Sequence, residues 1–486
     1  MAETIKKNKW ALLALASLMV LPLAACGGGG DKKDKDGDEE AAALPNPDPF
    51  PSTYEPWSSE PVLIEGAVLL LGNGEKIENG AILMSDGVIQ AVGKKGKVKL
   101  PGGKGEKIDA SGKYVTPGII DAHSHLGVYP SPSFRSTSDG NEATSPNTAQ
   151  VWIEHSVWPQ DPGFTRALAG GITSLQILPG SANLFGGRSV TLKNVPSRSV
   201  QDMKFPDAPY GIKMACGENP KRVYQNSGPS TRMGNFAGYR AAWIDAKAYK
   251  KKWDDYLEKV EAGEDAGDPP ARDLKLETLA GVLADDLFVN MHCYRADEMV
   301  QVLDMAKEFG YKVAAFHHVV EGYKVADRLA EEGVCAAVWA DWWGFKLEAY
   351  DSVRENAALI HNQPGSCAII HSDSAVGIQR LNQEAAKAMA DGQRLGIDID
   401  EEDVIQWLTL NPAKLLRIDD KVGTLEEGKM ADVVLWDRTP FSVYAHAEKV
   451  YIDGALMYDR DDPDNSPRTD FEIGQLENNM LGGAGQ

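Results

Sequence analysis

The sequence has few cysteines, no CxxC pair and no excess of positive charge. Its five cysteines are scattered over 486 residues. Such scattering argues against a cysteine-based zinc site and against a small scaffold held together by disulfides. Lysine and arginine total 50 against 71 acidic residues, which gives a formal net charge of −21 at pH 7. That charge argues against nucleic acid or an anionic membrane surface as a direct partner.

The N-terminal apolar segment is too short for a membrane-spanning helix. It runs from Trp10 to Leu23, whereas a spanning helix needs about 20 apolar residues. Three lysines precede it, as in a signal peptide. It ends in LAAC, with Cys26 followed by four glycines, and so resembles the lipobox of bacterial lipoproteins. We therefore predict a signal peptide over residues 1–25, lipidation of Cys26, and export to the periplasmic or cell-surface side of a bacterial membrane.

Composition divides the rest of the chain into segments. Residues 26–61 are rich in glycine, charge and then proline, and are expected to form a flexible tether. Short β-like runs occupy residues 62–114 and recur in 419–458. Neither set has enough strands to be stable alone, so we expect them to pair into a small composite β-sandwich domain. Residues 459–486 are expected to be a polar tail.

The central segment, residues 115–418, alternates strand-like runs with amphipathic helical patterns. This alternation predicts an α/β fold, a (β/α)8 barrel of the TIM type. The expected strands are 115–121, 172–178, 210–216, 286–292, 311–318, 333–339 and 366–372, and a further one is expected near 189–194. In such barrels the catalytic groups lie at the C-terminal ends of the strands.

Histidines and one aspartate end several of these strands. His123 and His125 close the run VTPGIIDAHSH, and alternate residues of a strand share a face, so their imidazoles lie side by side. His292, His318 and Asp373 close later strands. Taken singly, each has a structural interpretation, such as a helix cap for the aspartate. Together on one barrel face, they predict a centre for a divalent metal of the zinc type.

The wider motif set resembles the amidohydrolase superfamily, and most closely its imidazolonepropionase-like branch. Besides the two-histidine run it includes HVVEGY from His318, SDS around Asp373, TLNPA at 409–413 and GTLEEGKMADVVLW at 423–436. The resemblance covers about residues 62–458. It implies that His123 and His125 hold a first metal. It also implies that His292 and His318 hold a second metal or contact substrate, and that Asp373 binds metal and acts as general acid and base.

The ligand that bridges two metals is left open between two residues. The resemblance implies a carboxylated lysine or a glutamate, and Lys213 and Glu218 both lie in the right region. They stand an odd number of positions apart, so one regular strand cannot direct both inward. Glu218 is the preferred ligand, because it lies at the strand end and already offers a hard oxygen; Lys213 is the alternative.

Of the adjacent histidines, His318 is preferred because the Glu-Gly-Tyr spacing of the resembling family follows it. As its neighbour on the strand, His317 is then expected to point away into packing. His371 shares the parity of Asp373 and could orient it. The remaining cysteines lie in or beside expected strands and are interpreted as buried thiols; they are Cys216, Cys293, Cys335 and Cys367.

The expected reaction is hydrolysis of a C–N bond in a small molecule, an amide that is cyclic or otherwise not a peptide. One or two divalent ions, expected to be zinc, lower the pKa of a bound water to about 7 and give hydroxide. Asp373 and His318 are the expected catalytic residues, and Asp373 takes the proton and delivers it to the leaving nitrogen. The candidate substrate-binding residues, chosen for carboxylate contact or as an aromatic and cationic wall, are Tyr294, Arg295, Trp343 and Lys346.

Other functions remain open at this point. An Xaa-Pro-type dipeptidase of the same superfamily would be favoured by a carboxylated Lys213, and a ring deaminase would reuse His318 and Asp373. A non-catalytic surface-binding protein predicts missing ligands, whereas all five main ones are present. The expected partner is a small-molecule substrate, with no nucleic acid and with membrane contact only through the lipid anchor. A homo-oligomer is compatible with the sequence.

Overall fold

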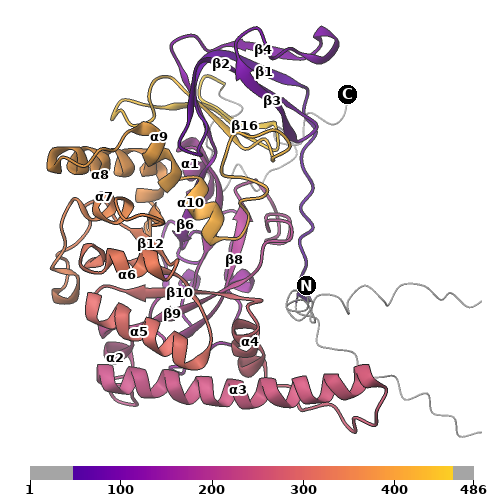
Figure 1. Ribbon diagram of the computed structural model, residues 1–486. Coiled ribbons are helices and arrows are strands. Elements are labelled where there is room, and N and C mark those ends of the chain that lie inside the picture. Colours follow the sequence, from indigo (N-terminus) through magenta and orange to yellow (C-terminus); the bar gives the residue numbers. More distant parts are fainter. Residues whose placement is uncertain (1–47, 463–486) are drawn as a thin grey trace, which may run out of the picture. The chain divides into compact units, whose positions relative to one another are not determined.

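The computed structural model describes residues 48–462 (Figure 1). Contacts divide them into a large unit, residues 52–250 and 272–462, and a small one that contains residues 251–271. The predicted signal peptide, the lipidation site Cys26, most of the tether and the tail from residue 463 lie outside the described residues. Among residues 48–462, none of the helices combines the length and apolar character that a bilayer crossing requires.

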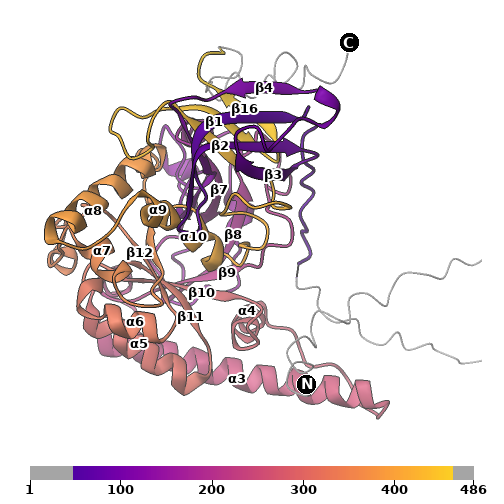
Figure 2. The same ribbon diagram turned by 45° about the horizontal axis from the view of Figure 1, so that its top comes forward.

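One sheet joins the two ends of the described chain. Its N-terminal strands are β1 (Val62–Leu70), β2 (Lys76–Ser85), β3 (Val88–Lys94), β4 (Glu106–Asp109) and β5 (Tyr114–Pro117), and its C-terminal strands are β14 (Val433–Trp436), β15 (Ala447–Ile452) and β16 (Ala455–Asp459). The order is β16-β15-β14-β5-β1-β2-β3, with β4 beside β1. Figure 2 shows the indigo and yellow strands side by side.

The junction of this sheet is the antiparallel pair β5–β14, in which Val115 lies opposite Leu435. Both side chains are fully buried, in a core that also contains Ile64 and Ile82. The expected pairing of the two terminal segments is therefore present. A two-layer sandwich, and the domain boundaries given above, stay predictions.

The second sheet is the expected eight-stranded, nearly closed barrel. Its strands are β6 (Ile119–Ser124), β7 (Ile172–Ile177), β8 (Phe185–Lys193), β9 (Gly211–Ala215), β10 (Phe288–Cys293), β11 (Val313–His318), β12 (Cys335–Val338) and β13 (Ala368–Ile370). They are neighbours in chain order. Most pairs are parallel, but β8 runs antiparallel to both β7 and β9.

The antiparallel strand corrects the prediction of a regular (β/α)8 repeat. Only residues 178–184 connect β7 to β8, and they contain no helix. A parallel pair needs a crossover of about a dozen residues or more. The connection is too short for a crossover here, so the chain returns antiparallel.

The predicted strand 115–121 is divided between the two sheets. It comprises the end of β5 and the start of β6, which are separated at Gly118. A Cβ at Gly118 would lie 2.0 Å from Oγ1 of Thr173 in β7. Glycine is required here because the neighbouring strand approaches the backbone so closely. The barrel strand β6 starts at the next residue, Ile119, and His123 is the fifth of its six residues.

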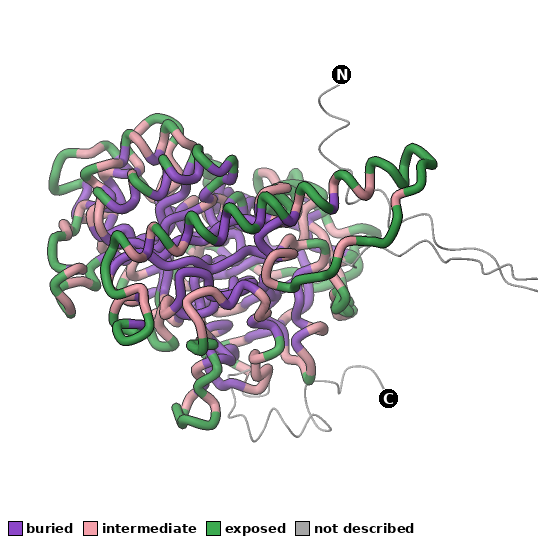
Figure 3. The backbone as a smooth tube through the Cα atoms, turned by 90° about the horizontal axis from the view of Figure 1, so that it is seen from below, coloured by how far each residue is buried: buried purple, intermediate pink, exposed green. Residues whose placement is uncertain are grey.

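Ten α-helices occur among the described residues. They are α1 (Pro162–Ala169), α2 (Glu218–Val223), α3 (Arg232–Ala262), α4 (Leu274–Leu283), α5 (Ala296–Phe309), α6 (Ala326–Glu331), α7 (Asn356–His361), α8 (Leu381–Leu395), α9 (Glu401–Val404) and α10 (Leu410–Leu415). In α5 the buried residues Met299, Val302, Ala306 and Phe309 recur at helical spacing, and Gly310 ends the helix at φ +80°. Figure 3 shows purple, buried backbone inside and exposed residues on surrounding helices.

The prediction of buried thiols is wrong for four cysteines. Cys216 forms a disulfide with Cys293, and Cys335 with Cys367, across sequence separations of 77 and 32 residues. Each bond joins neighbouring barrel strands, a relation that cysteine spacing alone does not reveal. Once Cys26 is set aside for lipidation, the remaining cysteines are even in number.

Candidate metal centre

Three predicted ligands meet where β6 and β13 end. Nε2 of His125 lies 3.1 Å from Oδ1 of Asp373, and Nε2 of His123 lies 3.6 Å from the same oxygen. One ligand atom of each residue falls within 4.8 Å of the others. Nδ1 of His125 donates to the carbonyl of Leu178 at 2.8 Å. This hydrogen bond orients the ring, so that Nε2 is the nitrogen directed at Asp373 and available to a metal.

Three further imidazoles crowd the same space. The His123 ring centre lies 4.9 Å from that of His318 and 5.0 Å from that of His371. The His292 ring centre lies 4.6 Å from that of His318. No nitrogen of His371, and neither Nδ1 of His292 nor Nδ1 of His318, has a hydrogen-bond partner among the described residues.

These orphaned nitrogens support a cation site. His123, His292, His318 and His371 are at most 2% exposed, and buried polar atoms almost always have partners. Burial lowers the pKa of His123, His292 and His318 well below the ordinary value, so their rings are neutral. Neutral imidazole is the form that binds a metal. The residues present therefore fit a divalent metal ion.

The structure separates the two candidates for the bridging ligand. Lys213, in β9, is fully buried, and its Nζ lies 3.2 Å from Nε2 of His123. Burial lowers the pKa of Lys213 to about 7. Glu218 begins α2 instead, partly exposed, with Oε1 3.4 Å from Nζ of Lys346. Gly217, at φ +76°, turns the chain after β9, so Glu218 does not continue the strand.

His317 does not point away into packing, contrary to the prediction. Its Nδ1 lies 3.0 Å from Nδ1 of His123, and its Nε2 lies 2.9 Å from Oδ1 of Asn290. The second contact requires a proton on Nε2, so Nδ1 accepts from His123. Strand alternation fails here because His318 and Val319 have positive φ values of 75° and 43°. Both adjacent histidines can therefore face the centre.

Asp121 contributes to this centre, although the sequence motifs did not single it out. Its carboxylate accepts from the backbone N–H groups of His123 and Ser372, each at 3.1 Å, and from the hydroxyl of Ser372. The backbone N–H of Asp373 donates to the carbonyl of His123 at 3.0 Å. These bonds connect the first and last strands of the barrel sheet. The sequence signal was a carboxylate inside an apolar run.

Asp373 is held in its ionised form. Burial by itself would raise the pKa of this carboxyl group, but the hydrogen bond from His125 and the charges of His125, His371 and Lys213 outweigh it and lower the pKa. An ionised carboxylate between imidazoles can bind a cation or accept a proton.

An aromatic wall borders the histidines, built partly by the segment after β12. The Trp339 ring stacks on His318, with centres 4.2 Å apart. Nζ of Lys346 lies 4.4 Å from the Tyr294 ring centre and donates to Oδ1 of Asn219 at 2.8 Å. Nδ2 of Asn219 lies 3.3 Å from Nε2 of His292. Neither Trp339 nor Asn219 was predicted; Trp339 is the last residue of the expected strand 333–339, and Asn219 stands three residues after the expected strand 210–216.

The other two substrate-binding candidates are placed differently. Nε of Arg295 donates to Oδ1 of Asp297 at 2.9 Å, and the Arg295 side chain is 42% exposed. This arginine therefore already has a carboxylate partner at the surface. Trp343 is half-buried in the segment that carries Lys346.

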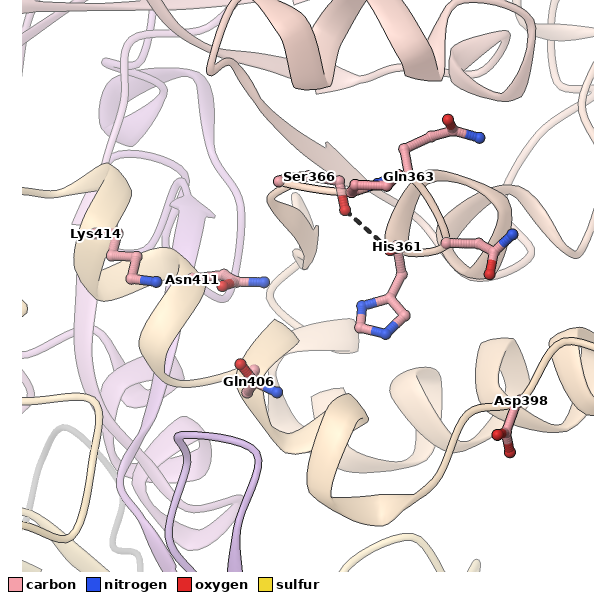
Figure 4. A pocket seen from close by; sticks show the side chains of 10 residues that line it. His361, Gln363, Ser366, Asp398, Gln406, Asn411 and Lys414 are labelled. Carbon is pink, nitrogen blue, oxygen red and sulfur yellow. Dashed lines mark hydrogen bonds between the residues drawn. The ribbon is translucent and has the colours of Figure 1, made fainter.

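A pocket lies elsewhere in the barrel unit, apart from the histidine cluster (Figure 4). It is lined by ten residues from His361 to Lys414, none of which is a predicted ligand. Ser366, on its wall, precedes β13, whereas Asp373 follows that strand. His361 accepts from the indole of Trp407 at 3.2 Å.

Comparisons with known proteins agree with this arrangement. A model of the amidohydrolase family matches residues 114–464. Amidohydrolase tasK of Hapsidospora irregularis is 31% identical over 368 residues, which cover 72% of this chain but only 37% of that protein. An imidazolonepropionase of Mesorhizobium japonicum is 25% identical over 391 residues, 74% of this chain and 87% of that protein.

A crystal structure of an amidohydrolase from Thermotoga maritima superposes with a TM-score of 0.74 at 35% identity, over 82% of this chain and all of that one. The amidohydrolase family is typically metal-dependent, and the histidine cluster is a potential metal site. The family model spans most of the folded chain, including every residue of the histidine cluster. The chain belongs to the amidohydrolase family and is a hydrolase that acts on C–N bonds.

Proposed function

We propose that this protein uses zinc, as one or two ions, to hydrolyse an amide C–N bond, cyclic or otherwise not a peptide, in a small molecule that carries a carboxylate. The observation that carries this proposal is the set of buried, partnerless imidazole nitrogens around Asp373. Imidazole and carboxylate ligands are the set that zinc prefers in catalytic sites.

The geometry suggests how the ligands divide. His123, His125 and Asp373 would hold one ion, since their ligand atoms already lie within 4.8 Å of one another. Lys213, in a carboxylated form, would bridge to a second ion held by His292 and His318. We favour Lys213 over Glu218 because its Nζ touches His123, whereas Glu218 pairs with Lys346. A bound divalent ion supplies a nucleophile at neutral pH and polarises the scissile bond.

The chain itself handles the proton. Asp373, ionised and 3.1 Å from Nε2 of His125, is placed to accept a proton and return it to the leaving nitrogen. His318 and the Trp339 ring stacked on it exclude water from one side of the centre. Asp121 and Ser372 hold the backbone of both Asp373 and His123 in register.

Lys346 is the candidate anchor for a substrate carboxylate. Its Nζ contacts the Tyr294 ring and Asn219, and Asn219 contacts His292. An ammonium group held beside the ligands can fix a carboxylate at a defined distance from the scissile bond. Tyr294 and Trp339 give the same space an apolar wall, suited to an apolar group on the substrate.

A dipeptidase of the Xaa-Pro type is the second candidate function, and the placement of Lys213 favours it. A dipeptide also carries a carboxylate close to its scissile amide, so Lys346 would serve it equally. A ring deaminase would use the same Asp373 and His318 but would release ammonia. A substrate screen separates these three reactions.

We also propose export and lipid anchoring at Cys26. The apolar segment ending in LAAC supports this proposal. The two disulfides also support it, because such bonds persist in oxidising compartments. The proposed partner is a small-molecule substrate, without nucleic acid, and with membrane contact only through the anchor.

The test is a screen of N-acyl amino acids, dipeptides and cyclic amides with zinc-loaded protein, in which amine and ammonia release are followed separately. We expect turnover of one carboxylate-bearing class, and a loss of roughly 10²- to 10⁴-fold in Asp373→Asn. Asp398→Asn, in the distant pocket, is the matched control and should retain full activity. Failure of the wild-type protein on every class, or unchanged turnover in Asp373→Asn, would remove the proposal.

A further inference from the structure

The Cys216–Cys293 disulfide lies at the edge of the barrel where the candidate ligands gather. The ladder between β9 and β10 ends with the pair Ala215 and His292. The residue that follows each of these two is a cysteine of the disulfide. The N–H of Cys216 also donates to the carbonyl of His292 at 2.9 Å. Both cysteines are at most 1% exposed. The covalent bond therefore extends the strand pairing by one position, directly beside His292.

This position is also where the chain leaves β9. Gly217 takes φ +76°, and α2 begins at Glu218. A Cβ at Gly217 would lie 2.4 Å from Oε1 of Glu348, so the turn is closely surrounded. Asn219 is the second residue of α2, and its Nδ2 lies 3.3 Å from Nε2 of His292. The placement of Asn219 against His292 thus depends on the exit angle from β9, which the disulfide fixes.

Asn219 restricts the orientation of the His292 ring. Nδ2 of its side-chain amide contacts Nε2, while Nδ1 of His292 has no partner among the described residues. A hydrogen bond to one ring nitrogen orients the ring, and with it the direction in which the other nitrogen points. Lys346 holds the other end of the same amide by donating to Oδ1. A displaced Asn219 would therefore release both the ring of His292 and the substrate anchor.

We propose that the Cys216–Cys293 disulfide is a positioning element of the metal centre, so that full metal affinity is reached only after oxidation of this pair. The step removes two protons and two electrons from the two thiols. The acceptor is a second disulfide, on an exchange protein or a small oxidised thiol, which becomes two thiols. The inference rests on the proposed metal centre.

The second disulfide provides a matched control within the chain. The ladder between β12 and β13 begins with the pair Ala336 and Ala368. Cys335 and Cys367 each stand one position before this pair. This bond also extends a parallel ladder by one residue pair, but at the strand starts, the end away from Asp373. A purely stabilising role would make the two disulfides equivalent.

The experiment compares two double variants of the full chain, Cys216→Ser/Cys293→Ser and Cys335→Ser/Cys367→Ser. Mass spectrometry of alkylated, unreduced protein first establishes the two disulfides in the wild type. Zinc affinity by chelator competition and the absorption spectrum of the Co²⁺-loaded protein are then measured well below the melting temperature. We expect both variants to lose similar thermal stability. Only the first should lose about tenfold or more in zinc affinity and change its Co²⁺ spectrum.

Asn219→Ala keeps the disulfide and serves if the first double variant fails to fold. It should reproduce the loss of affinity and the altered spectrum. Equal zinc affinity and unchanged Co²⁺ spectra in all variants, or free thiols at Cys216 and Cys293 in the active protein, would overturn the inference. Metal binding by the wild type would still stand in that case, so the proposed function is tested separately.

Discussion

Nζ of Lys213 lies 3.2 Å from Nε2 of His123, and both side chains are at most 1% exposed. Among the described residues, no carboxylate lies as close to Nζ of Lys213 as this imidazole does. A positive charge on this buried lysine would therefore have no carboxylate in direct contact to balance it. Carboxylation would convert it into an oxygen ligand between the histidines of β6 and those of β10 and β11. This proposed carboxylation would account for a cationic residue in the middle of a buried strand.

The first prediction distinguishes the two candidate bridging ligands. Lys213→Ala should lose at least one metal equivalent and roughly 10²-fold or more in kcat, because no other residue of β9 can replace the oxygen atoms of carboxylated Lys213. Glu218→Gln should retain the metal and lose only substrate affinity through Lys346. Metal analysis and steady-state kinetics of both variants provide the measurement. The reverse order would restore Glu218 as the bridge.

The second prediction concerns substrate anchoring. Lys346→Met should raise KM for carboxylate substrates about tenfold or more with a smaller change in kcat, since a charge-assisted hydrogen bond contributes about 1.5–3 kcal/mol. Arg295→Met is the control, because this arginine pairs with Asp297. Kinetics on a substrate and on its amide-capped analogue provide the readout. Equal effects in the two variants would contradict the assignment of Lys346.

The third prediction is a pH effect on stability from Glu298, a carboxylate on α5 that is 1% exposed and has no side-chain partner for either oxygen among the described residues. Burial, then Glu348, raises its pKa to about 7. Because the folded pKa exceeds the unfolded one, the folded protein binds the extra proton. Stability is therefore present below pH 4.5 and is lost as pH rises towards 7.

Glu298→Gln removes this penalty. We expect the variant to be more stable than the wild type at pH 8, by an amount on the order of 3 kcal/mol. The advantage should vanish well below pH 4.5, where the wild-type carboxyl is protonated in both states. Urea unfolding across this pH range measures the effect. A difference between the proteins that does not change with pH would contradict it.

The fourth prediction assigns similar stability to both disulfides. They close loops of 77 and 32 residues, for which chain entropy gives about 4 kcal/mol each, within 1 kcal/mol of one another. Each double serine variant should therefore lower the free energy of unfolding by a comparable amount. Denaturant unfolding of the two variants tests this expectation. A loss confined to one variant would contradict it.

The sequence was sufficient for features that depend on local patterns. His123, His125, His292, His318 and Asp373 were located because strand ends in a barrel converge on one face, and β5 and β14 were expected to pair because neither terminal segment could fold alone. These inferences needed only periodicity and strand order.

The sequence alone could not predict features that depend on backbone dihedral angles or on contacts between residues far apart in the chain. The direction of β8 followed from a connection too short to cross over, and the inward turn of His317 followed from the positive φ of His318. The choice between Lys213 and Glu218 depended on where Gly217 ends the strand. Disulfide pairing depended on which strands become neighbours.

The measurement that tests the central claim most directly is the metal content of the purified protein. Wild type and His123→Ala would be compared after dialysis against a weak chelator, with His361→Ala as the control from the distant pocket. We predict one or two equivalents of divalent metal in the wild type and in the control, and less than half of that in His123→Ala. A metal-free wild-type protein that hydrolyses amides at full rate would contradict the account.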